Sequence, residues 1–291
     1  MAKQQSPGPT GWRVDRVFAG KIQRYDNWYK GASSAIDKKE CKGAVTVGKL
    51  GITEDQQSRK SHGGPERALL QYAGENYDYI SKVFEKKKRD GLETSFDFDR
   101  LRSPGFGENI ATSCGMTEDT VCIGDVYKLG TATIQVSMPR APCFHLNHRF
   151  QARDRAHLLS ILVETQQKAG WLYRVLEAGK FKAGDEFVLV ERPLPNMSVK
   201  FAHRMVSETK FPLDAVKEMK DCALLAEKWR KYARERIANG NHPVGMSARL
   251  LGGSKGAHLK KGHFFSAGGC WYSVSLAIAV AAFVLVVFVD A

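Results

Sequence analysis

Short stretches in which apolar and polar residues alternate dominate the first two thirds of the chain. They contain many β-branched and aromatic residues and occupy residues 13–22, 44–50, 121–129, 131–138 and 187–191. Such alternation predicts β-strands with one buried face. Gly130 alone separates the third stretch from the fourth, which favours a hairpin.

Two longer segments, residues 75–88 and 155–168, carry apolar residues at helical spacing among these strands. Short strands mixed with occasional helices indicate an α+β fold, with a β-barrel-like domain over residues 11–192. Residues 1–10 are polar and include two prolines, so we expect a flexible leader there.

The pattern becomes helical after Arg192, where two prolines follow within three residues. Ser198 is suited to cap a helix, and Pro212 is suited to the first turn of another. The expected helices cover residues 199–206, 213–223 and 224–237. They predict a small three-helix domain over residues 193–238.

The C-terminal segment has a different composition from the rest of the chain. Residues 239–270 are rich in Gly, His and Lys, which predicts a flexible basic linker. Residues 271–289 contain no charged residue. As a helix this block would be roughly 28 Å long, close to the ~30 Å of a bilayer core, which predicts an apolar C-terminal helix that anchors the chain in a membrane. A buried core helix, and an altered reading frame or splice end, are the alternatives.

The overall composition is that of a globular protein. Hydrophobic residues make up 43% and charged residues 26%, which excludes a disordered, collagen-like or coiled-coil chain. The net charge of +13 is concentrated in residues 192–263, which carry 15 Lys and Arg against 6 Asp and Glu. Six cysteines are scattered without a C-x-x-C pair, and no secretory signal precedes them. We therefore expect reduced thiols in a protein body that faces the cytosol.

The basic run at residues 228–236 mixes cations with Trp229 and Tyr232. A solvated charged face is the simplest interpretation, since the two aromatic residues lie three apart and are expected to pack inward. A docking face for an acidic electron-donor protein or an anionic membrane is the second interpretation. Nucleic acid is the third, and we do not expect it as a partner.

A cysteine in a restricted backbone follows the fourth predicted strand. Pro139 and Pro142 limit the conformations around Cys143, and Arg140 supplies a cation three residues before it. A rigid thiolate flanked by a cation suits a metal ligand or a nucleophile, whereas a lone cysteine is more often a small buried hydrophobe.

Three chemistries are open for Cys143. It can act as a nucleophile with His145 or His148 as base, or bind zinc together with both histidines. It can also bind a soft redox metal whose other ligands come from an organic cofactor.

Two turns that contain glycine are further candidates for ligand binding. Gly63 and Gly64 permit close approach of the backbone to a ligand, and His62 and Arg67 flank this turn with donors suited to phosphate. An ordinary tight turn is the alternative. The sequence GFGEN at residues 105–109 lacks the third glycine of a dinucleotide-binding fingerprint, so we reject that motif.

Four short motifs, in this order along the chain, resemble those of MOSC-domain proteins. They are HGGPERA at residues 62–68, GENI at 107–110, GD at 124–125 and PRAPC at 139–143. The sequence GWLYRV at residues 170–175 and the three expected helices make the resemblance closest to the bacterial YiiM type. The resemblance covers about residues 11–238.

The resemblance implies a molybdenum cofactor bound to a β-barrel MOSC domain. Cys143 matches the family cysteine proposed to bind molybdenum, and is thus the expected metal ligand and catalytic residue. The expected cofactor-binding residues are His62, Gly63, Gly64, Arg67, Glu108, Asn109 and Arg140. The implied activity is reduction of N-hydroxylated compounds, such as N-hydroxylated purine bases, by removal of the N–O oxygen at molybdenum. The alternative is a carrier of molybdenum cofactor or sulfur that reduces no substrate; pyridoxal phosphate is not expected.

Expectations for partners and location follow from the same resemblance and from where this chain departs from it. The chain carries no flavin, haem or iron–sulfur motif, so electrons are expected from a separate reductase of the flavoprotein or cytochrome b5 type. The basic linker and the apolar block at residues 271–289 depart from the bacterial pattern. They predict a tail-anchored enzyme that faces the cytosol from the mitochondrial outer or endoplasmic-reticulum membrane, with a soluble cytoplasmic protein as the alternative.

Overall fold

A curled eight-stranded sheet is the centre of the fold. The computed structural model describes residues 11–26, 31–91, 95–152, 158–208, 211–240 and 246–251. The strands of the main sheet are β1 (Arg16–Ala19), β4 (Lys39–Glu40), β7 (Leu69–Ala73), β8 (Ile110–Thr112), β9 (Val126–Leu129), β10 (Ala132–Pro139), β11 (Trp171–Glu177) and β13 (Phe187–Glu191). Their order is β13-β9-β10-β11-β7-β8-β1-β4, antiparallel except for the parallel pair β7 and β8.

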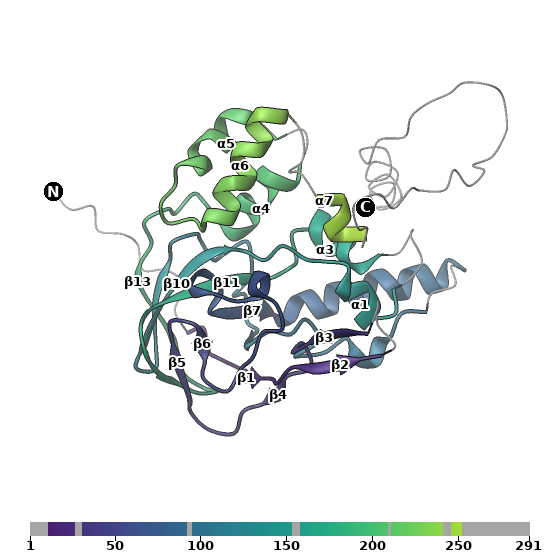
Figure 1. Ribbon diagram of the computed structural model, residues 1–291, viewed down its shortest axis with the longest axis horizontal. Helices are drawn as coiled ribbons and strands as arrows, with labels where there is room; N and C mark the ends of the chain where they lie inside the picture. Colours follow the sequence, from purple (N-terminus) through teal and green to yellow (C-terminus); the bar gives the residue numbers. More distant parts are fainter. Residues whose placement is uncertain are drawn as a thin grey trace.

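Backbone hydrogen bonds join the two sides of this sheet. Trp12 and Val14, just before β1, bond to residues 184–187, which lead into β13; the amide of Phe187 donates to the carbonyl of Trp12 at 2.9 Å. Two smaller sheets flank the main one, formed by β5 (Val45–Gly48), β6 (Gly51–Ile52) and β12 (Gly179–Phe181), and by β2 (Gln23–Tyr25) and β3 (Ala32–Ser34). The α+β class is thus confirmed, with the sheet curled into a half-barrel (Figure 1).

Strands β9 and β10 form the hairpin that the sequence predicts. Gly130 in its turn has φ +57°, and a Cβ there would lie 2.2 Å from the carbonyl oxygen of Lys180, so only glycine fits. The predicted exposed face is wrong for β10, because all eight of its residues are buried. Its polar residues, such as Gln135 and Ser137, are satisfied by hydrogen bonds to neighbouring backbone and side chains.

Helices cover the sheet and fill the connections between strands. They are α1 (Gly74–Arg89), α2 (His145–Arg149), α3 (Leu159–Thr165), α4 (Val199–Ser207), α5 (Leu213–Lys220), α6 (Glu227–Asn239) and α7 (Met246–Leu251), with single turns of 3-10 helix at η1 (Lys60–His62), η2 (Pro65–Arg67) and η3 (Phe98–Arg100). In α4 the amide of Phe201 donates to Ser198 Oγ at 3.1 Å, so the predicted cap is confirmed. The helix expected at 155–168 is shorter, and α2, β7 and β11 were not predicted.

The helices α4, α5 and α6 share one hydrophobic core with the half-barrel. The cluster of buried residues that contains Val136 and Trp171 of the sheet also contains Val199 of α4 and Trp229 of α6. Trp229 is 1% exposed, as its helical spacing predicted. The cations of α6 therefore lie mainly on its other faces. Arg236 is the exception, because it is 1% exposed and its guanidinium donates to the carbonyls of Met205 and Phe211.

The segment at residues 239–270 is not linker throughout. It contains α7, which packs against α3 (Figure 1), so the prediction of an uninterrupted flexible linker is wrong over Met246–Leu251. Within the described ranges, no helix is both long and apolar enough to cross a membrane. The leader expected at residues 1–10 and the anchor expected at 271–289 lie outside the described residues.

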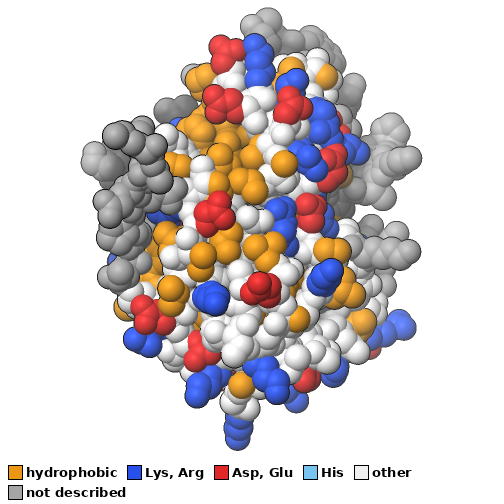
Figure 2. All heavy atoms as spheres, turned by 90° about the vertical axis from the view of Figure 1, so that its left-hand side faces the viewer, with side chains coloured by type: hydrophobic (Ala, Val, Ile, Leu, Met, Phe, Trp, Pro, Cys, Tyr) orange, Lys and Arg blue, Asp and Glu red, His pale blue; other side chains and the backbone are white. Residues whose placement is uncertain are grey.

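One edge of the main sheet presents apolar side chains to solvent. Val188 and Val190 of β13 are 52% and 59% exposed, and Leu213 at the start of α5 is 42% exposed. Figure 2, which views the molecule from this side, shows hydrophobic side chains gathered over the middle of the face. The helices therefore leave the outer side of β13 uncovered.

A buried ion pair ties the hairpin to the start of the helical segment. The carboxylate of Asp125 is 0% exposed, lies 2.7 Å from Nη2 of Arg192, and accepts hydrogen bonds from the amide of Cys122 and the hydroxyl of Tyr127, both at 2.9 Å. The glycine and aspartate motif at residues 124–125 thus has a structural role in this chain.

Replacement of Asp125 by Ala is expected to lower the free energy of unfolding by about 3–5 kcal/mol, because the Arg192 cation would lose its buried partner. Asp119→Ala is the control, since the Asp119 carboxylate is 58% exposed and pairs with Lys200 at the surface; its cost is expected to stay below about 1 kcal/mol. Urea unfolding of both variants measures the difference. Equal losses would contradict the structural role of Asp125.

Candidate active site

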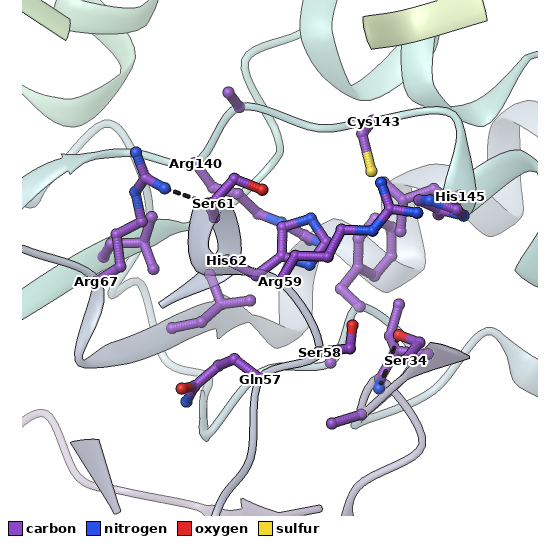
Figure 3. Close-up of a pocket in the computed structure, with 18 of the residues that line it drawn as sticks. Ser34, Gln57, Ser58, Arg59, Ser61, His62, Arg67, Arg140, Cys143 and His145 are labelled. Atoms are coloured by element: carbon purple, nitrogen blue, oxygen red, sulfur yellow. Dashed lines mark hydrogen bonds between the residues drawn. The ribbon is translucent and has the colours of Figure 1, made fainter. Parts of the chain in front are cut away.

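A pocket of about 330 Å³ lies where the sheet, the connections between its strands and the last helices meet. Its wall includes the segment 55–62, the end of β10 with the loop after it, and the helices α6 and α7. Residues within 33–38, 67–70 and 106–109, together with Leu172, complete it. Figure 3 shows residues of segment 55–62 and of the loop after β10 around a common space.

Cys143 lies in the loop between β10 and α2, and its sulfur points into the pocket (Figure 3). The thiol is free and half-buried. Its two neighbours are both hydrogen-bonded to Arg249 of α7: the Arg249 guanidinium donates to the carbonyl of Pro142, and the amide of Phe144 donates to the carbonyl of Arg249 at 2.8 Å. The loop is thus held on both sides of the thiol.

Arg140 supplies a buried cation that lacks a complete set of partners. Its backbone amide donates to the carbonyl of Gly170 at 2.9 Å, and its guanidinium lies 5.6 Å from the centre of the Phe106 ring. Its Nη1 atom is buried, and no group in the described part of the chain accepts a hydrogen bond from it. Burial lowers the pKa of Arg140. A buried donor without an acceptor is costly, so this position favours an anionic ligand.

Two histidines on the pocket wall are uncharged at neutral pH. The ring of His62 is open to the pocket, yet burial by surrounding atoms and the positive charges of Arg140 and Arg59 lower its pKa to about 4. Burial, with the charges of Arg59 and His148, also lowers the pKa of His145 to about 4. Both rings can therefore donate and accept hydrogen bonds without adding charge.

The charge of the pocket is strongly positive. Asp55 is the only carboxylate among the described lining residues, and Lys38 neutralises it in a buried ion pair. Four lining cations form no ion pair within the described ranges: Arg59, Arg67, Arg140 and Lys228. Burial, with the charges of Arg67 and Arg249, lowers the pKa of Lys228 to about 8. The pocket is therefore suited to an anion.

The structure brings most of the expected site residues to one place. His62, Arg67, Asn109, Arg140 and Cys143 all line the pocket. The Asn109 amide is committed to the fold, however: its Oδ1 accepts from the amide of Leu70, and its Nδ2 donates to the carboxylate of Asp55. Asn109 therefore supports the wall rather than offering free donors.

Three expected residues do not line the pocket. Glu108 is completely buried, and its carboxylate accepts hydrogen bonds from the hydroxyl of Tyr77 at 2.7 Å and the amide of Phe106 at 3.1 Å. Gly63 and Gly64 are also absent from the described lining. Gly64 has φ +109°, so its backbone conformation accounts for the glycine.

Part of the wall was not expected from the sequence. His145 was considered only as a base or a zinc ligand beside Cys143, Lys228 and Trp229 were assigned to the basic helix, and Arg249 lay in the expected linker. All four line the pocket. The last three come from helices more than 80 residues after Cys143, and no short motif connects such distant segments.

The geometry also bears on the chemistries open for Cys143. Within the described residues, no group of three or more His, Cys, Asp and Glu side chains is arranged to hold a metal ion, which argues against zinc bound by Cys143, His145 and His148. A His145 pKa of about 4 makes that ring a weak general base at neutral pH. Ligation of a soft metal carried by an organic cofactor remains compatible with a single thiolate.

Comparison with known proteins supports this choice. The family model described as "MOSC domain" matches residues 58–188, which include every expected site residue. Protein YiiM of Escherichia coli (strain K12) is 35% identical over 225 residues, covering 77% of this chain and 92% of YiiM. A protein of Gibberella moniliformis named "Reductase" is 34% identical over 239 residues, which cover 80% of this chain and 38% of that protein.

The likeness extends to the fold. The crystal structure of YiiM from Escherichia coli superposes with a TM-score of 0.64 at 29% identity, covering 83% of this chain and 99% of YiiM. MOSC domains are associated with molybdenum-cofactor binding. By sequence and by structure, this chain belongs to the MOSC-domain family and is related to the YiiM proteins.

Proposed function

We propose that the protein is a molybdenum-cofactor-dependent reductase of N-hydroxylated compounds, with N-hydroxylated purine bases as its substrate class. Membership of the MOSC family and the name of the fungal relative support an oxidoreductase linked to the molybdenum cofactor. The observation that carries the proposal is the convergence of a free thiol, Cys143, and a buried cation, Arg140, on one positively charged pocket.

The residues present fit such a cofactor. The cofactor carries a phosphate and a metal held by sulfur, and so needs both an anion-binding group and a soft ligand. Arg140 offers a buried Nη1 donor that no described group uses, and Arg67 adds a second cation on the same wall. Cys143 offers the thiolate. When bound, the cofactor would supply a two-electron centre at which an N–O bond is reduced to an amine and water.

The side chains of the pocket would have distinct tasks. Cys143 would coordinate the metal and influence its reduction potential. Lys228, with a pKa of about 8, would hold a proton near the reacting oxygen at neutral pH. The neutral rings of His62 and His145 would orient the substrate through hydrogen bonds without adding further positive charge.

Electron supply and location extend the proposal. Electrons would come from a separate flavoprotein or cytochrome b5 type reductase, and the apolar segment at residues 271–289 would hold the enzyme on a membrane. The alternative function is a carrier of molybdenum cofactor or sulfur. It is favoured by the same free thiol, and differs in producing no amine from an N-hydroxylated base.

Cys143→Ala is expected to remove most of the molybdenum from protein made in cofactor-competent cells, because the metal would lose its protein ligand. Elemental analysis should find about one molybdenum per wild-type chain. Cys114→Ala is the matched control, since Cys114 is exposed and away from the pocket lining. No molybdenum in any of the three proteins, or equal loading in all, would contradict the proposed ligand role.

The same preparations separate the two functions. With a reduced dye as electron source, loaded wild-type protein should convert an N-hydroxylated purine base to the amine, which chromatography detects. Loaded protein that forms no amine would favour the carrier.

Arg140→Met is expected to have opposite effects on loading and on stability. Without the guanidinium the pocket should retain much less molybdenum, because the phosphate of the cofactor would lose its buried hydrogen-bond donor. Cofactor-free protein should become more stable by about 1 kcal/mol, since the donor without an acceptor is removed. Urea unfolding of the apoprotein tests the second effect, and a destabilised apoprotein would show that Arg140 serves the fold instead.

The reduction rate is expected to fall as pH rises through about 8, the pKa of Lys228. Below this pH the ammonium holds its proton, and above it the donor is lost. On the acid side the rate should not change until the pH falls to about 4, because His62 and His145 stay neutral above their pKa of about 4. Lys228→Arg and Lys228→Met should both be slow and show no alkaline decline, because a guanidinium does not release its proton and a thioether carries none. An unchanged alkaline decline in Lys228→Arg would assign it to another group.

A further inference from the structure

The helix α7 contacts the loop of Cys143, and the proposed function does not yet assign it a role. It comprises only Met246–Leu251 and follows the three helices that cover the half-barrel. Figure 1 shows it beside α3, at the end of the described chain and apart from α4, α5 and α6. Its position raises the question of what it contributes to the pocket.

Arg249 of α7 bonds to the residues on both sides of Cys143. The guanidinium Nη1 donates to the carbonyl of Pro142, and the backbone carbonyl of Arg249 accepts from the amide of Phe144 at 2.8 Å. One residue, more than 100 positions later in the chain, thus fixes the backbone before and after the thiol. Loops are more mobile than the elements that they connect, so this double restraint limits the freedom of the thiol.

A buried carboxylate fixes Arg249 in turn. Nη1 and Nη2 of Arg249 lie 3.2 and 3.0 Å from the two oxygens of Glu164 in α3, in a two-point contact. The Glu164 side chain is only 4% exposed, and Nε2 of His203 in α4 lies 3.3 Å from it. Burial would raise the pKa of Glu164, but His203 and Arg249 lower it to about 2. The carboxylate is therefore charged at neutral pH and holds the guanidinium in place.

The next residue of α7 gives a second attachment to the same region. The carbonyl of Leu250 accepts hydrogen bonds from Ser160 Oγ at 2.8 Å and from Asn147 Nδ2 at 3.3 Å. Asn147 lies in α2, directly after the cysteine loop, and its Oδ1 accepts from the amide of Ser160 at 2.8 Å. These bonds connect α2, α3 and α7, so the loop between β10 and α2 is held from its far end as well.

We propose that Arg249 is a positioning residue for Cys143, and that α7 is a strap that holds the thiol in its direction toward the pocket. The guanidinium bridges the Glu164 carboxylate and the Pro142 carbonyl, and this bridge needs the fork of an arginine. The inference rests on the functional role proposed for Cys143. It adds that the C-terminal segment, outside the match to the MOSC family model, completes the site.

The rate of thiol alkylation tests the proposal in the full-length protein without any cofactor. Iodoacetamide labelling followed by peptide mass spectrometry reports each cysteine separately. Cys143 reports the loop, and Cys122, which is buried in the half-barrel, reports global opening. In Arg249→Ala, labelling of Cys143 is expected to become about tenfold faster or more, while labelling of Cys122 stays unchanged, because only the loop gains freedom.

Three further variants refine this test. Arg249→Lys keeps the charge but lacks the fork, and should also label fast. Glu164→Gln keeps the shape of the carboxylate and should give a smaller acceleration. Arg204→Ala, which breaks an exposed ion pair with Glu208, is the matched arginine control and should label like wild type.

Several results would overturn the positioning role. These are labelling of Cys143 within twofold of wild type in Arg249→Ala, equal acceleration of Cys143 and Cys122, or full restoration by Arg249→Lys. Because labelling needs no metal, its outcome is independent of the molybdenum measurement. Absence of molybdenum would overturn the proposed function alone, and unchanged labelling would overturn the strap alone.

Discussion

The burial of strand β10 on both of its faces is the constraint on which the site depends. Its apolar residues belong to the core that the half-barrel shares with the helices after it, and all eight residues of the strand are buried. A strand held in this way has a defined end at Pro139. The chain then leaves the sheet at one place and in one direction, and Arg140 and Cys143 enter the pocket from there.

The chemistry of the pocket follows from charge that the fold leaves without compensation. Asp55 is balanced by Lys38, whereas Arg140 keeps a buried donor without an acceptor among the described residues. Stability alone would not favour such an arrangement, since a buried cation gains from a partner. Functional sites often retain groups that are unfavourable for stability. The unpaired donor of Arg140, next to the Cys143 thiol, is suited to bind an anion.

Only part of the pocket lies inside the match to the MOSC family model. The lining residues from Ser58 to Leu172 belong to that match, and those from Ser33 to Gln57 precede it. Lys228 and Arg249 lie after it, on helices that pack against the barrel or its connecting helices. The helices are therefore part of the site, because they supply a cation to the pocket wall and a restraint on the cysteine loop.

Local pattern was sufficient for several of the elements, and it predicted where a functional thiol should lie. Alternation predicted the β9–β10 hairpin, the cap at Ser198 was recognisable, and the short proline-flanked segment around Cys143 indicated a functional thiol, because each of these depends on neighbours in the chain. The alternating pattern wrongly predicted that the polar face of β10 is exposed. The composition of residues 239–270 predicted a linker where the chain forms α7. Both failures have one cause: burial and pairing with residues far along the chain decide which faces see solvent and which segments dock. The closeness of Arg249 to Cys143 is a property of the folded chain, since no local preference of either segment encodes a contact across more than 100 residues.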